Sequence, residues 1–477
     1  MIQAEVTLNP YRVLGDIDPL FYGQYVEALD PPAKPIYGGV CDDQGMLRED
    51  VICDLQEMKV PVIRWGGNYM DLYHWQDGIG PREARPLYYN YQWGGGYESN
   101  QFGTHEYLEL CERLNAVPYI NFNLGTGTLQ EALGWLEYCN FAGDTTFTRL
   151  RRQNGRAEPW RVPIWGVGNE SWGLHEASFS APEVYADRFN RFAHFLREFD
   201  PTLQLVGVGW NHTDWNQTVL QKIMHAPEYF SIHMYGHSHI GTENNYERLV
   251  GTPIFFEKFV LPRFAEDIRR FGKKPIGIIV DEWNVRHFFN GKINRASPRR
   301  MEDAIFSAGF LNAMQRNAAV VKMTNQTCMV NSLAPLIATP TGTVRTPLYE
   351  VFKLYQKYCH SQVIAAQVVS PTYHCVPTPC TSFDPLATDY DADYLDASAT
   401  ISPDRTRTTV ALINRHSQET MRVRLRLPYQ QPPQRIWLCQ VSAESTDALQ
   451  ASVQVISPVS LDEVELPPHS FGFLMFE

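Results

Sequence analysis

The sequence predicts an α/β protein made of a (β/α)8 TIM barrel and a C-terminal antiparallel β-sandwich of jelly-roll type. Up to residue 360, eight short apolar runs alternate with stretches long enough to form a helix, which is the pattern of a parallel barrel. From residue 361 onward, apolar and polar residues alternate with period two, as in half-buried antiparallel strands. We therefore divide the chain into a catalytic barrel over 18–360 and a β-sandwich domain over 361–477, which residues 1–17 join.

The eight predicted barrel strands are short apolar runs, mostly bounded by Gly, Pro or Asn, as expected of strands covered on both faces. They are 19–27, 60–65, 117–124, 162–169, 204–210, 229–235, 275–282 and 319–326. Among the intervening helices, one is predicted over 181–199, where Phe189 and Leu196 belong to an apolar series at helical spacing. Residues 180–183 predict a capping box at its start, with Pro182 just inside the helix.

The C-terminal strands are predicted from period-two alternation, which is clearest over 421–427, where apolar residues alternate with arginines. Further strands are predicted at 394–401, 408–414, 434–440, 451–456 and 470–476. Residues 371–393 are rich in Pro, Thr and Asp and predict an irregular surface loop. The spacing of its acids Asp384, Asp389, Asp391 and Asp393 does not fit a calcium-binding EF-hand.

Composition and charge limit the kinds of partner and the cellular compartment that we expect for this protein. The net charge of -12 argues against nucleic acid and membrane surfaces. The start of the chain does not resemble a signal peptide, and the sequence contains no run of 18 apolar residues. Its nine cysteines are odd in number and scattered, which favours free thiols in a reducing compartment. We expect a cytoplasmic protein without a metal or a cofactor.

Two acidic residues end two of the predicted strands. Glu170 follows the apolar run at 162–169, and Glu282 closes the run at 275–282. In a parallel barrel, the carboxyl ends of all strands meet at one face, where active sites are built. Two carboxyl groups are also what glycoside hydrolysis needs, one to protonate the leaving oxygen and one to attack the sugar carbon. The pair therefore predicts a glycoside hydrolase.

Polar residues end the other strands as well. A single strand-end Asn is usually a turn former, but polar side chains at all eight ends are hard to explain by core packing. They are Glu27, Arg64, Asn68, Asn121, Asn123, Asn169, Glu170, Trp210, Asn211, His233, Tyr235, Glu282, Asn325 and Gln326. A metal site at His233, His237 and His239 is not predicted, because no acidic partner is near in sequence. We expect His233 to contact a carboxylate or a sugar hydroxyl.

An ordered series of motifs covers nearly the whole chain. It comprises Phe21–Glu27, Tyr73–Pro81, Asn100–Glu106, Asn123–Thr128, Gly168–Glu170, Ser231–Tyr235, Asp281–Asn284 and Met329–Asn331. In these motifs the sequence resembles glycoside hydrolase family 51, whose best-known members are α-L-arabinofuranosidases. The resemblance implies a barrel with a jelly-roll-like sandwich, a retaining mechanism without a metal, and action inside the cell on short oligosaccharides, with hexamers common.

The resemblance also implies roles for residues. Glu170 is expected to be the general acid/base and Glu282 the nucleophile. Glu27, Asn169, His233 and Tyr235 are expected to bind the furanose or orient the nucleophile, and Arg64, Asn68, Trp172 and Gln326 complete the candidate substrate-binding set. We expect the two catalytic carboxyl groups roughly 5 Å apart, and the charge of Glu282 to raise the pKa of Glu170.

Three departures from the family pattern surround the sugar subsite. The segment Arg64–Asn68 lacks a Pro and is one residue shorter, Ala28 replaces a His, and Cys328 stands where the family has Gln, a role that Gln326 could fill. The sequence therefore predicts an exo-acting retaining α-L-arabinofuranosidase that acts on arabinofuranose-containing oligosaccharides and forms a homo-oligomer. It leaves open a β-D-galactofuranosidase, a β-xylosidase or a β-glucanase of the same mechanism, and a non-catalytic carbohydrate-binding protein.

Overall fold

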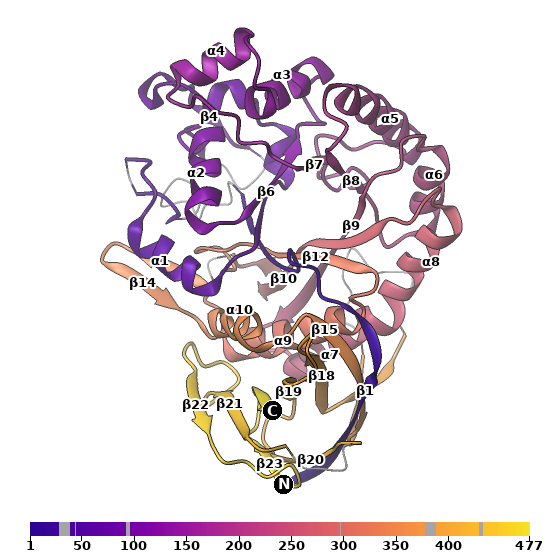
Figure 1. Cartoon of the computed structure of the whole chain (residues 1–477). Coiled ribbons are helices and arrows are strands. Elements are labelled where there is room, and N and C mark those ends of the chain that lie inside the picture. The colour runs from indigo at the N-terminus through magenta and orange to yellow at the C-terminus, as the bar shows by residue number, and fades with distance from the viewer. Residues whose placement is uncertain (28–38, 43, 92–95, 296, 377–387, 429–432) are drawn as a thin grey trace.

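The computed structural model describes residues 1–27, 39–42, 44–91, 96–295, 297–376, 388–428 and 433–477. Ala28 and Asp384, noted in the sequence, lie outside these residues, and so does Cys380, one of the nine cysteines. Figure 1 shows a barrel ringed by helices, with a sheet domain beneath it that holds both termini. Among the described residues, no helix is both long and apolar enough to cross a membrane.

The barrel consists of eight parallel strands. They are β2 (Tyr22–Val26), β3 (Val62–Trp65), β6 (Val117–Phe122), β7 (Ile164–Val167), β8 (Gln204–Val208), β9 (Tyr229–His239), β10 (Gly277–Phe289) and β12 (Val321–Gln326). Neighbours pair in this order, and the ring closes where β12 pairs with β2. All eight predicted strands are confirmed. A layer of side chains fills the barrel interior, formed by Val62, Tyr119, Ile164, Val206, Ile279 and Met323.

Helices surround the barrel and cover the outer faces of its strands (Figure 1). They are α1 (Glu49–Met58), α2 (Thr104–Leu114), α3 (Leu129–Asn140), α4 (Thr146–Gln153), α5 (Pro182–Phe199), α6 (Thr213–Lys222), α7 (Asn245–Phe255), α8 (Leu261–Phe271), α9 (Met301–Arg316) and α10 (Pro347–Tyr358). A π-helical turn, η5 (Phe256–Val260), joins α7 to α8. Helix α5 confirms the predicted helix, but its capping box is wrong: the N-cap is Ala181, which has no capping oxygen, although Pro182 does start the helix.

The C-terminal domain is a curled sheet of nine strands. In spatial order these are β22 (Ser452–Ile456), β21 (Ile436–Ser442), β24 (Ser470–Phe476), β19 (Thr408–Asn414), β18 (Leu395–Ile401), β15 (Gln362–Val369), β1 (Ile2–Asp16), β20 (Met421–Arg426) and β23 (Val464–Leu466). The curl encloses an apolar core that includes Val6, Leu412 and Val423. The period-two pattern of β20 is confirmed, since its apolar residues are buried and its arginines are not.

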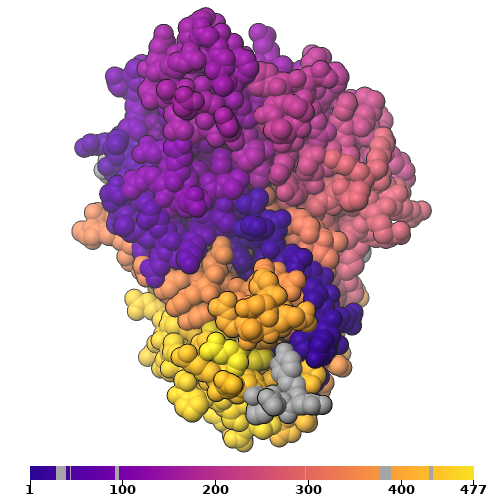
Figure 2. All heavy atoms as spheres, viewed as in Figure 1, coloured from indigo at the N-terminus to yellow at the C-terminus, as the bar shows by residue number. Residues whose placement is uncertain are grey.

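The first strand belongs to this C-terminal sheet and not to the barrel. β1 pairs antiparallel with β15 and parallel with β20, as predicted for residues 1–17. In the space-filling view, the indigo N-terminal segment lies against the orange and yellow C-terminal part of the chain (Figure 2). The two ends of the sequence are therefore held in one sheet.

The prediction of an irregular loop over 371–393 is wrong at both ends of that segment. Strands β16 (Thr372–Cys375) and β17 (Tyr390–Asp393) pair there as an antiparallel ribbon. The ribbon is anchored because Cys375 and Tyr390 are buried, with the Cys375 thiol 3.2 Å from the Tyr390 hydroxyl. Short ribbons that the sequence did not predict are β4 (Tyr88–Tyr89) with β5 (Tyr97–Glu98), β13 (Leu336–Thr339) with β14 (Gly342–Arg345), and β11 (Lys292–Ile293) added to β10.

Candidate active site

The structure brings Glu170 and Glu282 together at the carboxyl end of the barrel. Glu170 follows β7 by three residues, and Glu282 lies within β10. Both are buried, and carboxylate oxygens of the two residues lie within 4.8 Å of each other. This matches the predicted spacing of roughly 5 Å, whereas a pair separated by a water molecule would be distinctly wider.

The backbone around Glu170 is unusual. Glu170 has φ of +36° and Gly168 has φ of +89°, and the first of these is uncommon for a residue with a side chain. A Cβ on Gly168 would approach a methyl of Leu124 to 2.9 Å, so this position favours glycine. The turn is closed by the Gly173 amide, which donates to the Glu170 carbonyl at 2.7 Å. Strain at such a position is typical of functional sites.

Glu282 is held by three side chains from two strands, Arg64 on β3 and His233 and Tyr235 on β9. The Tyr235 hydroxyl donates to its Oε1 at 2.5 Å, and the Arg64 guanidinium donates to its Oε2 at 3.1 Å. The His233 ring lies 3.5 Å from the same Oε2. With both oxygens fixed, the Glu282 carboxylate has a defined orientation, as an attacking group requires.

Arg64 is the centre of the charged network beneath the carboxylates. It is only 1% exposed and pairs with Asp281 at 3.1 Å and Glu282 at 3.1 Å. Its NH2 donates to Asn169 Oδ1 at 2.6 Å, and its Nε donates to Asn121 Oδ1 at 3.3 Å. Burial by itself raises the pKa of Asp281, but Arg64, together with His233 and Ser231, outweighs that effect and holds the pKa well below its usual range. Arg64 therefore holds Asp281 and Glu282 in place from the barrel interior.

Glu170 accepts a hydrogen bond on each carboxylate oxygen. His233 Nδ1 lies 2.8 Å from Oε1, and His175 Nε2 lies 2.7 Å from Oε2. Burial raises the pKa of Glu170, but the two histidines together lower it well below its usual range. The prediction that the pKa of Glu170 is raised is therefore wrong, because it did not include the two histidines that contact Glu170. The two hydrogen-bonded histidines thus favour the charged form of Glu170.

Glu27 directly follows β2 and packs against Gly67, a position that only glycine can occupy. The Tyr25 hydroxyl donates to its Oε2 at 2.5 Å, and the Tyr69 amide donates to its Oε1 at 3.1 Å. A Cβ on Gly67, whose φ is +86°, would overlap the Tyr25 hydroxyl and the Glu27 carboxyl. Burial and the charge of Glu282 raise the pKa of Glu27 to about 7. Asn68 follows Gly67 directly and is buried at the start of a 3-10 turn, Asn68–Asp71.

The remaining predicted residues lie at different depths. Asn169 is buried and donates to Glu176 Oε1 at 3.0 Å. Gln326 is fully buried, donates to the Thr327 and Leu333 carbonyls at 2.9 and 3.1 Å, and so supports the strand end from below. Trp172 is partly exposed and stacks on Trp210, with ring centroids 4.8 Å apart and an interplanar angle of 5°. An exposed, flat aromatic pair of this kind offers a surface for a sugar ring.

Sequence reasoning missed two residues of the loop after Glu170. His175 contacts Glu170, and Glu176 lies buried behind it, 3.6 Å from the His175 ring. Burial, Glu170 and other nearby acids raise the pKa of Glu176 to about 11, so it is protonated. The only signal in the sequence was the presence of two ionisable residues five and six positions after a strand-end acid.

One family departure, Cys328, sits beside the site. It is buried and packs against the Tyr25 ring. Tyr25 in turn donates a hydrogen bond to Glu27, so the replacement lies one side chain away from that carboxyl.

The Arg286 guanidinium lies over the Tyr235 ring, 3.6 Å from its centroid, and adds a cation to the mouth of the site.

Within the described chain, histidine and carboxylate side chains form two clusters in which the potential metal-ligand atoms lie within 4.8 Å of one another. They are Glu170 with His175 and Glu176, and Glu170 with His233 and Glu282. Both groups depend on Glu170, whose two oxygens already accept hydrogen bonds from histidines. The donor set is that of a hydrogen-bonded acid pair, and we assign it no metal or cofactor.

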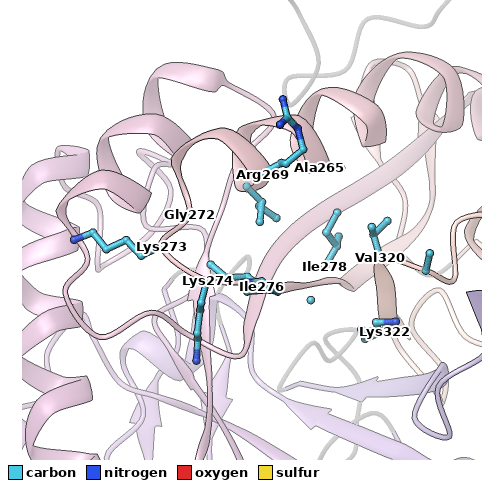
Figure 3. A pocket seen from close by; sticks show the side chains of 13 residues that line it. Ala265, Arg269, Gly272, Lys273, Lys274, Ile276, Ile278, Val320 and Lys322 are labelled. Carbon is cyan, nitrogen blue, oxygen red and sulfur yellow. The ribbon is translucent and has the colours of Figure 1, made fainter.

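A cavity of about 550 Å³ lies elsewhere, beside the amino-terminal ends of β10 and β12 and next to α8 (Figure 3). Its walls combine apolar residues such as Ile276 with Lys273, Lys274 and Lys322. Neither Glu170 nor Glu282 lines it. Lys274 pairs with Glu228 at 2.8 Å, and we assign no chemistry to this cavity.

Comparison of the sequence with known proteins gives matches over most of the chain. Residues 54–251 match the model of the alpha-L-arabinofuranosidase 1 domain, and residues 281–470 match that of the alpha-L-arabinofuranosidase C-terminal domain. A probable alpha-L-arabinofuranosidase C of Aspergillus niger is 33% identical, over 87% of this chain and 86% of its own. An intracellular exo-alpha-L-arabinofuranosidase of Bacteroides ovatus is 34% identical, over 74% of this chain and 72% of its own.

Solved structures extend the similarity to the whole fold. The family 51 alpha-L-arabinofuranosidase of Thermotoga petrophila superimposes with a TM-score of 0.88 at 29% identity, covering 99% of this chain and 100% of its own. That of Xanthomonas axonopodis pv. citri gives 0.88 at 25% identity, with both chains covered completely. The similarity thus covers both the barrel and the curled C-terminal sheet. The chain is a glycoside hydrolase and belongs to family 51, the family of the α-L-arabinofuranosidases.

Proposed function

We propose that the protein releases terminal, non-reducing α-L-arabinofuranosyl residues from oligosaccharides, with Glu282 as nucleophile and Glu170 as acid/base. The observation that supports these roles best is the spacing of the pair, within 4.8 Å, which suits a retaining mechanism. The partners of the two acids differ in a way that fits the assignment. Glu282 is fixed by Arg64 and Tyr235, whereas Glu170 is bonded to two histidines that can exchange protons.

In the first step, a Glu282 oxygen attacks the anomeric carbon and forms a glycosyl ester, while Glu170 protonates the departing glycosidic oxygen. Arg64 and Tyr235 hold the nucleophile in place during the attack. In the second step, Glu170 takes a proton from water, the water oxygen bonds to the anomeric carbon, and Glu282 departs as a carboxylate. Two inversions at one carbon leave the product with the configuration of the substrate.

The sugar subsite in this proposal is formed by Glu27, Asn68, Asn169, His233 and Tyr235. Glu27 is the side chain best suited to accept hydrogen bonds from furanose hydroxyls, since it is an acid that follows β2 at the carboxyl end of the barrel, beside the closely packed turn at Gly67. Trp172 offers its ring to the next sugar, on the leaving-group side. Arg64 and Gln326 support the subsite from the barrel interior, because both are almost completely buried.

We place the enzyme in the cytoplasm as a homo-oligomer, with a hexamer as the first form to test. The Bacteroides ovatus relative is named as intracellular, and the described cysteines are free thiols, which suits a reducing compartment. We also keep the domain limits 18–360 and 361–477 with 1–17, supported by the pairing of β1 with β15. Light scattering on the purified chain measures the assembly.

A panel of nitrophenyl glycosides tests the proposed substrate. The α-L-arabinofuranoside should be hydrolysed with the highest kcat/KM among substrates that also include the β-D-galactofuranoside, the β-xyloside and a β-glucan oligosaccharide. NMR of the first product should show retained configuration. A higher kcat/KM on another glycoside would transfer the same mechanism to that sugar, and absence of turnover on every member would refute the proposed catalysis.

A further inference from the structure

The loop after β7 places a histidine on the acid/base that the two-carboxylate mechanism does not use. His175 Nε2 lies 2.7 Å from Glu170 Oε2, and its side chain is 50% exposed, whereas that of Glu170 is 8% exposed. The His175 ring also packs edge-on against Trp172, with centroids 5.8 Å apart. His175 thus joins a buried catalytic oxygen to solvent, beside the aromatic surface offered to the leaving group.

This contact creates a chemical requirement. Glu170 must bring a proton to the leaving oxygen, but both its oxygens are hydrogen-bonded to histidines, which favour its charged form. A proton must therefore reach Glu170 when the substrate is bound. Of its two histidine partners, His233 is only 7% exposed and is fixed between Glu170 and Asp281. His175 is the partner with access to water.

The charges around His175 favour its protonated form. The groups that act on it and on its two acidic neighbours are Glu170, Glu176, Glu282, His233, Arg286, Asp71 and Glu27. The hydrogen bond to Glu170 raises the pKa of His175, and this effect outweighs burial and the cation Arg286. Glu176 is itself protonated, so it does not compete with Glu170 for the imidazolium charge.

We propose that His175 is a positioning residue that holds the proton of the reaction in the free enzyme and delivers it to Glu170 when the substrate binds. This inference rests on the proposed role of Glu170 as the acid/base. It adds a third ionisable group to the pair, and it explains why a half-exposed histidine lies on a buried catalytic oxygen.

The proton moves in a closed cycle. On substrate binding, it passes from His175 Nε2 to Glu170 Oε2 along their hydrogen bond, which leaves His175 neutral. Glu170 then gives it to the glycosidic oxygen as the bond to the anomeric carbon breaks and the bond to Glu282 forms. In the second half, attacking water loses a proton to Glu170, which passes it to His175 Nε2. The imidazolium and the carboxylate are thereby restored, and no other reactant is needed.

The variant His175→Gln keeps a hydrogen-bond donor but cannot titrate. We expect its kcat on arabino-oligosaccharides to fall by about tenfold to a hundredfold, because proton transfer to a poor leaving group is impaired. Its kcat on 2,4-dinitrophenyl α-L-arabinofuranoside should stay near that of the wild type, since this leaving group needs no proton. The alkaline limb of the pH profile on oligosaccharides should move to lower pH, because the proton must then reside on Glu170 itself.

His175→Ala with added imidazole gives a second measurement. Free imidazole should restore turnover of oligosaccharides in this variant and leave the dinitrophenyl rate unchanged. His225→Gln is the matched control: His225 lies between α6 and β9, at the other end of the barrel, and this change should leave all rates and the pH profile unaltered. Thermal melting of each variant reports whether it is folded.

The outcomes separate this inference from the function on which it rests. A His175→Gln enzyme with an unshifted alkaline limb and wild-type kcat on oligosaccharides would overturn the role of His175. So would an equal loss on all leaving groups in a folded variant, which would point to a structural contact. A wild-type enzyme without turnover on any arabinofuranoside would instead refute the proposed function itself.

Discussion

Two clusters of buried charges in this molecule are built from the same residue types but are balanced differently. At the barrel's carboxyl end, Arg64 pairs with both Asp281 and Glu282, and three further buried acids lie nearby, namely Glu27, Glu170 and Glu176. Where the barrel meets the C-terminal sheet, Arg316 pairs with Glu257 and Asp396 at 2.5 and 2.7 Å. Arg415 pairs with the same Asp396 at 2.7 Å. There, two arginines face two acids.

The consequence appears in the protonation of the acids. At the domain interface, burial raises the pKa of Asp396, but its two arginines outweigh this and lower it. In the active site, acids exceed arginines, and the pKa of Glu27 is raised to about 7 and that of Glu176 to about 11. A charge-balanced cluster is a structural joint, whereas an excess of acids leaves protons that can move. The ratio of arginines to acids therefore distinguishes the structural charge cluster from the catalytic one.

The largest expected effect comes from removing the nucleophile. Glu282→Ala should lower kcat/KM on every substrate by at least about 10⁴-fold, because both chemical steps need this carboxylate. The melting temperature should not fall greatly, since the change also removes a buried charge from an acid-rich cluster. Rates on the nitrophenyl and dinitrophenyl arabinofuranosides measure the effect. Residual activity near the wild-type level would show that the nucleophile lies elsewhere.

Removing the acid/base should give a loss that depends on the leaving group. Glu170→Ala should reduce oligosaccharide hydrolysis by about 10²- to 10⁴-fold and the first step with a dinitrophenyl leaving group much less. Azide should partly restore turnover and give a glycosyl azide of retained configuration, because a small anion can enter the space that Glu170 occupied. Equal losses on good and poor leaving groups would argue against an acid role.

The balanced cluster should respond in stability and not in chemistry. Asp396→Ala leaves two arginines with one acid, because Arg316 keeps Glu257 whereas Arg415 loses the carboxylate that it pairs with, and we expect a loss of about 3–5 kcal/mol in the free energy of unfolding. Because the pKa of Asp396 is lowered in the folded state, its stabilisation is present above about pH 4 and is lost as the pH falls further. Urea unfolding at pH 7 and pH 3 measures both effects.

Arg422→Ala is the control for that experiment. It breaks an exposed pair with Glu465, which typically contributes less than about 1 kcal/mol. For both variants, kcat measured on the folded fraction should equal that of the wild type. A drop in kcat for folded Asp396→Ala would show that the two clusters are coupled.

Among the three acids of the active site that are substituted, Glu27 should give the smallest effect, with Glu27→Gln keeping the shape of the side chain and removing its charge. A charged hydrogen bond contributes roughly 1.5–3 kcal/mol, so kcat/KM should fall by about tenfold to a hundredfold if Glu27 accepts from sugar hydroxyls. The melting temperature should change little, because the Tyr69 amide can still donate to the amide oxygen and the Tyr25 hydroxyl can rotate to accept from the new NH2 group. Full retention of kcat/KM would exclude the substrate role.

The sequence was sufficient for the features set by local pattern. Strands covered on both faces read as short apolar runs, so all eight barrel strands were found, and period-two alternation identified strands such as β20. The pairing of Glu170 with Glu282 followed from the geometry of a barrel. It needed no knowledge of loops, because strand ends converge by topology alone.

Features set by loop conformation could not be predicted. The contact between His175 and Glu170 depends on a turn in which Glu170 has positive φ, and no residue pattern indicates that. The pKa of Glu170 was predicted in the wrong direction for the same reason, since its histidine partners come from that loop and from β9. The ribbon of β16 and β17 was missed because Cys375 and Tyr390 become buried only by tertiary contacts.

The shared sheet of the two chain ends also constrains how the protein is made. β1 ends at Asp16, and its antiparallel partner β15 begins only at Gln362. At synthesis rates of about 5–20 residues per second, the first strand waits roughly 17 to 70 s for that partner to emerge. During this interval β1 is an unpaired strand with its apolar face uncovered, which exposes it to association with other chains. The barrel can form meanwhile, so the last part of the molecule to fold contains the first residues made.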